Sequence, residues 1–111
     1  MRYYERVDEP IELRIYRGRF SKWIDSNKDK RGAAIIRARL NRIRLGNFGD
    51  SKSVGGGVEE LRIDFGPGYR VYFGRDGQSV VILLGGGSKQ TQSKDIQRAR
   101  ALWEDYLNGK D

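Results

Sequence analysis

The second half of the chain contains three apolar runs that are separated by two short glycine-containing turns. Apolar and polar residues alternate through residues 58–65, and the same alternation continues through residues 69–75. Residues 80–84 are all apolar, which is typical of a central strand that is covered on both faces. Between the last two runs, Asp76-Gly77 is a strong signal for a tight hairpin. The pattern predicts an antiparallel meander, which restricts the chain to folds built on a sheet.

The turn between the first two runs sets their predicted register. Residues 66–68, with the sequence Gly-Pro-Gly, predict a three-residue hairpin loop. Keeping the apolar residues of both strands on one face then places Arg62 opposite Tyr72 and Asp64 opposite Arg70. We therefore expect these four side chains to share the polar face of the sheet.

The rest of the chain supplies further elements, which we predict from alternation and from apolar residues at helical spacing: strands at residues 11–16 and 48–54, and helices at residues 19–25, 29–45 and 92–107. Asp29 is the predicted N-cap of the second helix, and Gly46 is its stop signal. The resulting order is strand–helix–helix, then an antiparallel meander of about four strands, then a C-terminal helix. This order predicts a compact α+β fold.

The length of 111 residues is enough for one domain. Residues 1–10 mix charges with two tyrosines and show no clear period, so we interpret them as an N-terminal extension. Residues 11–108 are then a single domain. No apolar run approaches the ~20 residues of a membrane-spanning helix, and no signal-peptide pattern follows Met1. We therefore expect a cytoplasmic protein with no membrane partner.

The composition excludes several classes of chemistry. The chain has no cysteine, so it has no disulfides, thiolate zinc sites or cysteine nucleophiles. It also has no histidine, which removes Ser-His triads and histidine metal ligands. Residues 85–91 are rich in glycine but lack the spacing of a phosphate-binding P-loop. Glu59 and Glu60 occupy successive strand positions and point to opposite faces, which argues against a glycosidase pair. We predict no metal and no cofactor.

Positively charged side chains are the main candidates for functional residues once these classes of chemistry are excluded. Lys plus Arg total 22 against 15 Asp plus Glu, a net charge of +7 that favours a polyanionic partner. Arg62 and Arg70 share the predicted polar face, Lys52 lies in the short strand before it, and Lys89 follows the central strand. RNA cleavage without a metal needs cations for the developing charge and a base for the 2′-OH proton. A lysine can supply that base when its pKa is lowered. A solvated basic face is the alternative interpretation of the same residues.

Two further features suggest contact with RNA. The predicted helix at residues 29–45 carries many cations, and Arg37, Arg42 and Arg44 are candidates for binding RNA phosphates. On the predicted polar face, the ring of Tyr72 could stack on a base. The alternative is that this helix only turns a solvated basic side away from the core.

Four segments together resemble one branch of the RelE/ParE toxin superfamily, the HigB-like, phage-derived addiction module killer proteins. They are LGNFGDSKSVG (residues 45–55), ELRI (60–63), GPGYRVYF (66–73) and LLGGGSK (83–89). The likeness covers residues 11–107, with the motifs in family order. It implies a RelE-like fold and the toxin of a bacterial type II toxin–antitoxin pair. The best-studied relatives are mRNA interferases, ribosome-dependent endonucleases that cut mRNA through 2′-OH attack.

The resemblance also implies roles for individual residues. Arg70 corresponds to the arginine that binds the scissile phosphate, and Lys89 to a cation beyond the last strand. Arg62 corresponds to a basic residue before the turn, and Lys52 belongs to the branch signature. Asp95 stands where some relatives have an aromatic residue or histidine, which leaves base stacking and base specificity open.

The implied partners are a ribosome, its mRNA and a helix-turn-helix antitoxin that forms a hetero-oligomer with the toxin. Two other functions remain open at this point. One is a ParE-like, non-enzymatic toxin that binds DNA gyrase. The other is a degenerate member that only binds its antitoxin.

Overall fold

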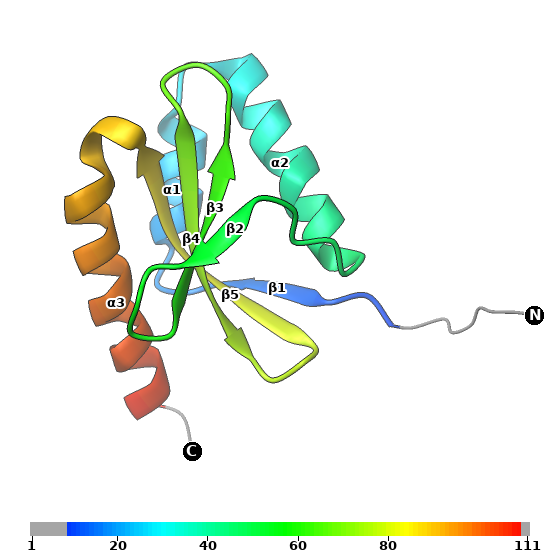
Figure 1. Ribbon diagram of the computed structural model, residues 1–111, viewed down its shortest axis with the longest axis vertical. Coiled ribbons are helices and arrows are strands. Elements are labelled where there is room, and N and C mark those ends of the chain that lie inside the picture. The colour runs from blue at the N-terminus through cyan, green and yellow to red at the C-terminus, as the bar shows by residue number, and fades with distance from the viewer. Residues whose placement is uncertain (1–8, 110–111) are drawn as a thin grey trace, which may run out of the picture.

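A five-stranded sheet with helices on both faces forms the framework of the computed structural model, which describes residues 9–109 (Figure 1). The elements in chain order are β1 (Glu12–Ile15), α1 (Arg19–Ser26), α2 (Lys30–Arg44), β2 (Ser51–Ser53), β3 (Val58–Ile63), β4 (Tyr69–Asp76), β5 (Val80–Ser88), the short 3-10 helix η2 (Lys89–Thr91) and α3 (Gln92–Asn108). The predicted α+β class and element order are confirmed. Of the predicted N-terminal extension, residues 1–8 lie outside the described part of the chain, and Glu9 and Pro10 are exposed.

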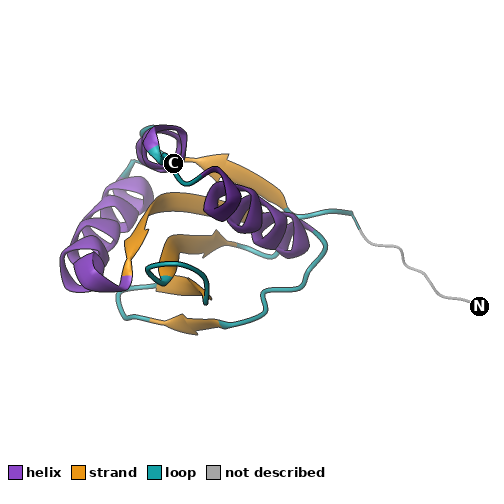
Figure 2. Cartoon of the chain, turned by 90° about the horizontal axis from the view of Figure 1, so that it is seen from above, coloured by secondary structure: helices purple, strands orange, loops and turns teal. Residues whose placement is uncertain are grey.

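The strands lie in the order β1-β5-β4-β3-β2. Strands β2 to β5 pair antiparallel, as the meander prediction required, while β1 pairs parallel with β5. Figure 2 shows the strands lying between the helices. The predicted strand at residues 48–54 shortens to three residues, and the predicted strand at 80–84 extends to Ser88. Within residues 9–109, no helix is both long and apolar enough to cross a membrane.

The predicted register of the β3–β4 hairpin is wrong by two residues. Arg62 lies opposite Arg70 and Glu60 lies opposite Tyr72, so Asp64 is not opposite Arg70. The loop has five residues because Phe65 leaves the strand and packs beside α2, where the Arg31 guanidinium lies 5.7 Å from its ring centre. Both registers keep the same residues on the same face, because side-chain direction in a strand repeats every two residues.

The two faces of the sheet carry separate cores. On one face, α1 and α2 cover the sheet with a continuous cluster that includes Ile36, Leu61 and Phe73, all fully buried. On the other face, α3 covers a smaller cluster that includes Tyr72 and Trp103. Because neighbouring residues of a strand point to opposite faces, Tyr72 and Phe73 belong to different cores.

Helix α2 starts as predicted. The Asp29 carboxylate accepts a hydrogen bond from the Gly32 backbone N–H at 2.8 Å, which satisfies one of the free donors at the helix N-terminus. The same carboxylate accepts a hydrogen bond from the Tyr69 hydroxyl at 2.6 Å. These hydrogen bonds lower the pKa of Asp29, the bond from Tyr69 contributing most. The start of α2 is thereby tied to the first residue of β4.

One irregularity in β5 matters for the site. The pairing register between β4 and β5 shifts by one residue between Tyr72 and Phe73, which leaves Leu84 as an extra residue on β5. After this bulge the alternation of β5 is reversed, so Gly86 lies under the Trp23 ring of α1 while Gly87 lies under Asp95 of α3.

Candidate functional site

Three of the four predicted catalytic residues surround one cavity. The cavity has a volume of about 230 Å³ and lies on the α3 face of the sheet, at the end that α3 leaves open. Its lining residues come from the β3 and β4 strands, from the loops beside them and from η2: Asp50, Arg62, Asp64, Gly68, Arg70 and Lys89. The structure thus brings Arg62, Arg70 and Lys89 together. We call this space the hairpin cavity.

Arg70 is held more firmly than an ordinary surface arginine. Only 11% of its side chain is exposed, and its Nη1 donates a hydrogen bond to the Tyr69 carbonyl oxygen at 3.1 Å. Its Nε lies 3.9 Å from Glu60 Oε1. Neither of these two buried atoms has a hydrogen-bond partner, so the pair is in ionic contact without a hydrogen bond. The Arg70 guanidinium is therefore fixed in place with donors available toward the cavity.

Glu60 is the buried carboxylate behind Arg70. It is fully buried, and its Oε2 accepts hydrogen bonds from the Tyr72 hydroxyl at 3.2 Å and from Gln92 Nε2 at 2.7 Å. Burial and the neighbouring carboxylate raise the pKa of the Tyr72 phenol. Sequence reasoning treated Glu60 only as one of two adjacent acids. A signal was present in the sequence: Glu60 is an acidic residue within a predicted strand that has neighbours on both sides, and acidic residues are seldom fully buried unless they are paired.

Arg62 stands beside Arg70 on the neighbouring strand. Like charges directly opposite one another destabilise a strand pair, and here a carboxylate reduces that effect. Asp50 lies 3.0 Å from the Arg62 guanidinium, and its backbone carbonyl accepts a hydrogen bond from the Arg62 N–H at 2.8 Å. The planar guanidinium groups of Arg62 and Arg70, side by side in this lining, suit the oxygens of a phosphate.

Lys89 reaches the hairpin cavity because a backbone hydrogen bond holds the end of β5 against the β3–β4 loop. Its backbone N–H donates a hydrogen bond to the carbonyl oxygen of Gly68 at 2.8 Å. Gly68 has φ +79°, a conformation that favours glycine, and the space beside it is filled by Lys89 and Arg70. The hairpin loop and the end of β5 are therefore joined, which places Lys89 next to Arg70.

The other predicted site residues lie elsewhere. Lys52 is opposite Glu60 on β2 and is exposed, but it does not line the hairpin cavity. Arg37, Arg42 and Arg44 belong to α2, which covers the opposite face of the sheet, and Arg37 contacts Asp25 at 3.4 Å. The proposed role of Tyr72 is wrong, because the side chain is fully buried beneath α3 and cannot stack on a base.

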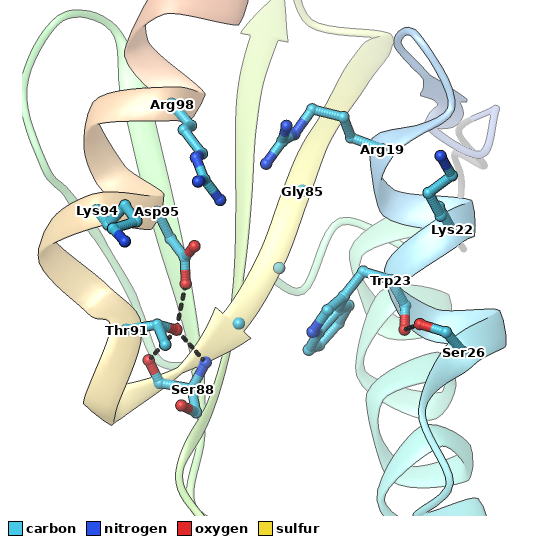
Figure 3. A pocket seen from close by; sticks show the side chains of 12 residues that line it. Arg19, Lys22, Trp23, Ser26, Gly85, Ser88, Thr91, Lys94, Asp95 and Arg98 are labelled. Carbon is cyan, nitrogen blue, oxygen red and sulfur yellow. Dashed lines mark hydrogen bonds between the residues drawn. The ribbon is translucent and has the colours of Figure 1, made fainter.

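A second, larger cavity runs along the end of β5. Figure 3 shows it between α1 on one side and α3 on the other, with a volume of about 620 Å³. Four cations line it: Arg19 and Lys22 from α1, and Lys94 and Arg98 from α3. Asp95 is the residue that stands where some RelE/ParE toxins, which the sequence motifs resemble, have an aromatic residue or histidine. It lines this cavity rather than the hairpin cavity, and it accepts a hydrogen bond from the Thr91 hydroxyl at 2.5 Å. We call this space the edge groove.

No group of three or more acidic, histidine or cysteine side chains that could hold a metal ion occurs within residues 9–109. The lining of the hairpin cavity offers guanidinium, ammonium and carboxylate groups. Such a set can bind an anion, stabilise a developing negative charge and transfer a proton.

Comparison with known proteins gives one informative match. No family model matches the chain. A protein of Haemophilus influenzae, described as uncharacterized, is 52% identical over 83 residues, which are 75% of this chain and 84% of the relative. This degree of identity over most of both chains indicates a shared fold.

Proposed function

The chain belongs to the same family as the Haemophilus influenzae protein, whose description names no activity. We therefore propose a function from the residues of the site itself. The protein is a cytoplasmic, ribosome-dependent mRNA endonuclease and the toxin of a type II toxin–antitoxin system. The observation that carries this proposal is the convergence of Arg62, Arg70 and Lys89 on one cavity. The resemblance of the sequence motifs to RelE/ParE toxins supports it, and with it a RelE-like fold.

The proposed reaction is a transesterification at one phosphodiester. The 2′-oxygen forms a bond to phosphorus, and the bond from phosphorus to the 5′-oxygen breaks. The 2′-hydroxyl loses a proton and the 5′-oxygen gains one, so the products are a 2′,3′-cyclic phosphate and a 5′-hydroxyl end. The protein must therefore stabilise a more negative phosphorane and move protons on both sides of it.

The residues of the hairpin cavity fit these tasks. Arg70 and Arg62 bind the non-bridging oxygens, and the buried Glu60 keeps the Arg70 guanidinium in position. Lys89 and Asp64 also line the cavity, and neither has an ion pair within residues 9–109. We assign proton transfer to these two groups, with Lys89 supplying the proton of the leaving oxygen.

The test is cleavage of mRNA on translating ribosomes by the purified protein. Arg70→Ala should lower the cleavage rate about 10²–10³-fold, as expected for removal of a group that stabilises transition-state charge. Lys89→Ala should lower it about 10²–10⁴-fold, as expected for loss of a general acid. Arg14→Ala is the matched control, since this exposed β1 arginine pairs with Glu12 and lies outside both cavities. Circular dichroism should show that all three variants are folded.

The outcomes separate the competing functions. If both site variants cut mRNA at the wild-type rate, the assignment of the cavity is wrong. Intact mRNA together with DNA damage after expression would favour a gyrase-binding toxin. A wild-type chain that has no effect on growth would favour a member that only binds its antitoxin.

The proposal includes a partner. A basic toxin of this kind is expected to bind a helix-turn-helix antitoxin with acidic or apolar segments, and binding of the folded state alone would raise its stability by mass action. Co-expression with the neighbouring gene product, followed by size-exclusion chromatography, tests whether such a complex forms.

A further inference from the structure

We propose that the edge groove is a second RNA site, which holds a single-stranded segment beside the scissile linkage with one base against Trp23 and its phosphates on the cations of α1 and α3. This inference rests on the proposed function, because it names how the same RNA extends beyond the hairpin cavity. No residue of the groove is among the predicted catalytic residues.

The charge of the groove is not neutralised by the protein. The side chains of Arg19, Lys22, Lys94 and Arg98 form no ion pair within residues 9–109. The acidic side chain in the lining, Asp95, accepts a hydrogen bond from Thr91. By contrast, Arg62 in the hairpin cavity contacts Asp50. The four exposed cations on these two helices are therefore available to a polyanion, and a nucleic-acid backbone that binds them releases its counterions.

The groove also contains an aromatic ring at the right place. Trp23 lines the cavity, is partly exposed and is held by Phe20 and Tyr69, whose ring centres lie 5.9 and 6.0 Å away. It lies so close to Gly86 that a Cβ there would come within 2.4 Å of the ring. The ring is thus fixed over β5 on the α1 side of the groove, opposite the cations of α3 (Figure 3). Aromatic side chains in basic grooves serve as stacking platforms for unpaired bases, whatever their sequence.

The strand beneath the groove is open. β1 pairs with β5 only as far as Leu83, so residues 84–88 form an edge of the sheet. Residues 85–87 are glycines that line the groove, and their missing side chains leave room for Trp23 above Gly86 and Asp95 above Gly87. The volume of about 620 Å³ lies within the range of ~300–1,000 Å³ that is typical of small-molecule ligand pockets.

Neighbouring residues at the end of β5 line the two cavities: Ser88 lines the edge groove, and the next residue, Lys89, lines the hairpin cavity. The proposed RNA strand passes from one cavity to the other at this point. A segment of acidic protein would also match the charge, but it would not use the fixed ring of Trp23. The ring and the nearness of the hairpin cavity together favour RNA.

The test measures binding without cleavage. The probe is a six-nucleotide oligoribonucleotide with 2′-O-methyl groups, which has no free 2′-OH and cannot be cut. The chain has two tryptophans, and Trp103 is buried under α3 at 5% exposure. We expect the probe to quench fluorescence in the wild type but not in Trp23→Phe, in which Trp103 is the remaining tryptophan.

Charge variants test the walls of the groove. Arg19→Ser combined with Arg98→Ser removes one cation from each side and should weaken binding at least about tenfold. It should also reduce the slope of log K against log salt by about 1.4, since each phosphate contact on a single strand contributes about 0.7. Arg14→Ser combined with Lys28→Ser is the control, because it removes the same charge from exposed residues outside both cavities. The control should bind the probe like the wild type.

Failure of this inference can be told apart from failure of the proposed function. Quenching of Trp23 by a protein that does not cut mRNA would support the groove and overturn the endonuclease. Cleavage by a protein whose Trp23 fluorescence does not respond, or equal binding by the groove and control variants, would overturn the groove. Equal quenching of Trp23 by a polyglutamate peptide of matched charge would also overturn it, in favour of an acidic protein partner.

Discussion

The two faces of the sheet are built on different principles. The face under α1 and α2 carries the larger apolar core, with Leu61, Val71 and Phe73 fully buried. On the opposite face, the apolar cluster under α3 gives way to Glu60 and Arg70 and then to the hairpin cavity. Most of the first face forms the larger core, whereas the second face changes from the smaller core to the hairpin cavity along β3 and β4.

The comparison shows how a small domain can hold a charged site without losing its fold. Arg70 of the hairpin cavity lies directly beside the buried carboxylate of Glu60, which is hydrogen-bonded to Tyr72 of the smaller core and to Gln92 of α3. Buried ionic groups of this kind contribute little net stability, because desolvation offsets their attraction. The larger core on the other face therefore has to stabilise the domain. Four variants test this division, starting with the largest expected effect.

Phe73→Ala should destabilise the protein most, by about 3–5 kcal/mol, because it leaves a cavity in the larger core. Phe73 is fully buried and its ring stacks on that of Phe48 at 5.8 Å. Chemical denaturation measures the free energy of unfolding. Leu45→Ala is the control: Leu45 is 75% exposed, and its loss should change stability by less than about 0.5 kcal/mol. A loss below about 1 kcal/mol for Phe73→Ala would contradict the division.

Glu60→Gln should cost about 1–3 kcal/mol and also lower activity, because the buried Arg70 guanidinium loses its counter-charge. Denaturation and ribosome-dependent cleavage measure the two effects. The adjacent Glu59 is the matched control, since it points to the other face and pairs with Arg75 near the surface. Glu59→Gln should cost about 0–1 kcal/mol and leave cleavage unchanged. Equal effects of the two variants would show that Glu60 does not position Arg70.

Tyr72→Phe should cost about 1 kcal/mol at neutral pH, since it removes one hydrogen bond to Glu60. The substitution should also change how the free energy of unfolding depends on pH above about pH 9. Burial raises the pKa of Tyr72 in the folded protein, so the folded state binds the proton more tightly than the unfolded state does. That contribution is complete below the unfolded pKa of about 10 and is lost as the pH rises above it. Denaturation at pH 8, 9.5 and 11 should show a smaller loss in the variant.

Asp29→Asn should have the smallest effect at pH 7, because asparagine is an equally good N-cap. Its effect should appear in acid. Hydrogen bonds from Tyr69 and Gly32 lower the pKa of Asp29 below its ordinary value of 3.8. The stability that they add is present above that value and is lost as the pH falls through the folded pKa. Thermal melting from pH 6 to pH 2 should show a flatter acid limb in the variant. An unchanged limb would mean that Asp29 does not contribute to acid stability.

The sequence predicts the elements better than their register. Periodicity and the Asp29 cap place α2 almost to the residue, because these signals are local. The same periodicity cannot distinguish two registers of the β3–β4 hairpin that differ by two residues, so Arg62 was placed opposite Tyr72 instead of Arg70. The packing of Phe65 on α2, which lengthens the loop, depends on tertiary contact and has no local signal.

The candidate site was predictable to a similar extent. Arg62, Arg70 and Lys89 were predicted from their places around the sheet and from the family motifs, and they line one cavity. Tyr72 was assigned to an open polar face because the sequence does not show which part of that face α3 covers. The edge groove could not be predicted, since it depends on where β1 ends and on the bulge at Leu84.

The early end of β1 has a further consequence for solubility. The chain turns away from β5 through two residues with left-handed backbone, Arg17 at φ +58° and Gly18 at φ +67°, and enters α1. An uncovered strand edge can recruit the same edge of another molecule and start aggregation, and flanking positive charges oppose this by mutual repulsion. The cations of α1 and α3 therefore also oppose pairing of the β5 edges of two copies of this protein, and replacing several of them at once should promote self-association through β5.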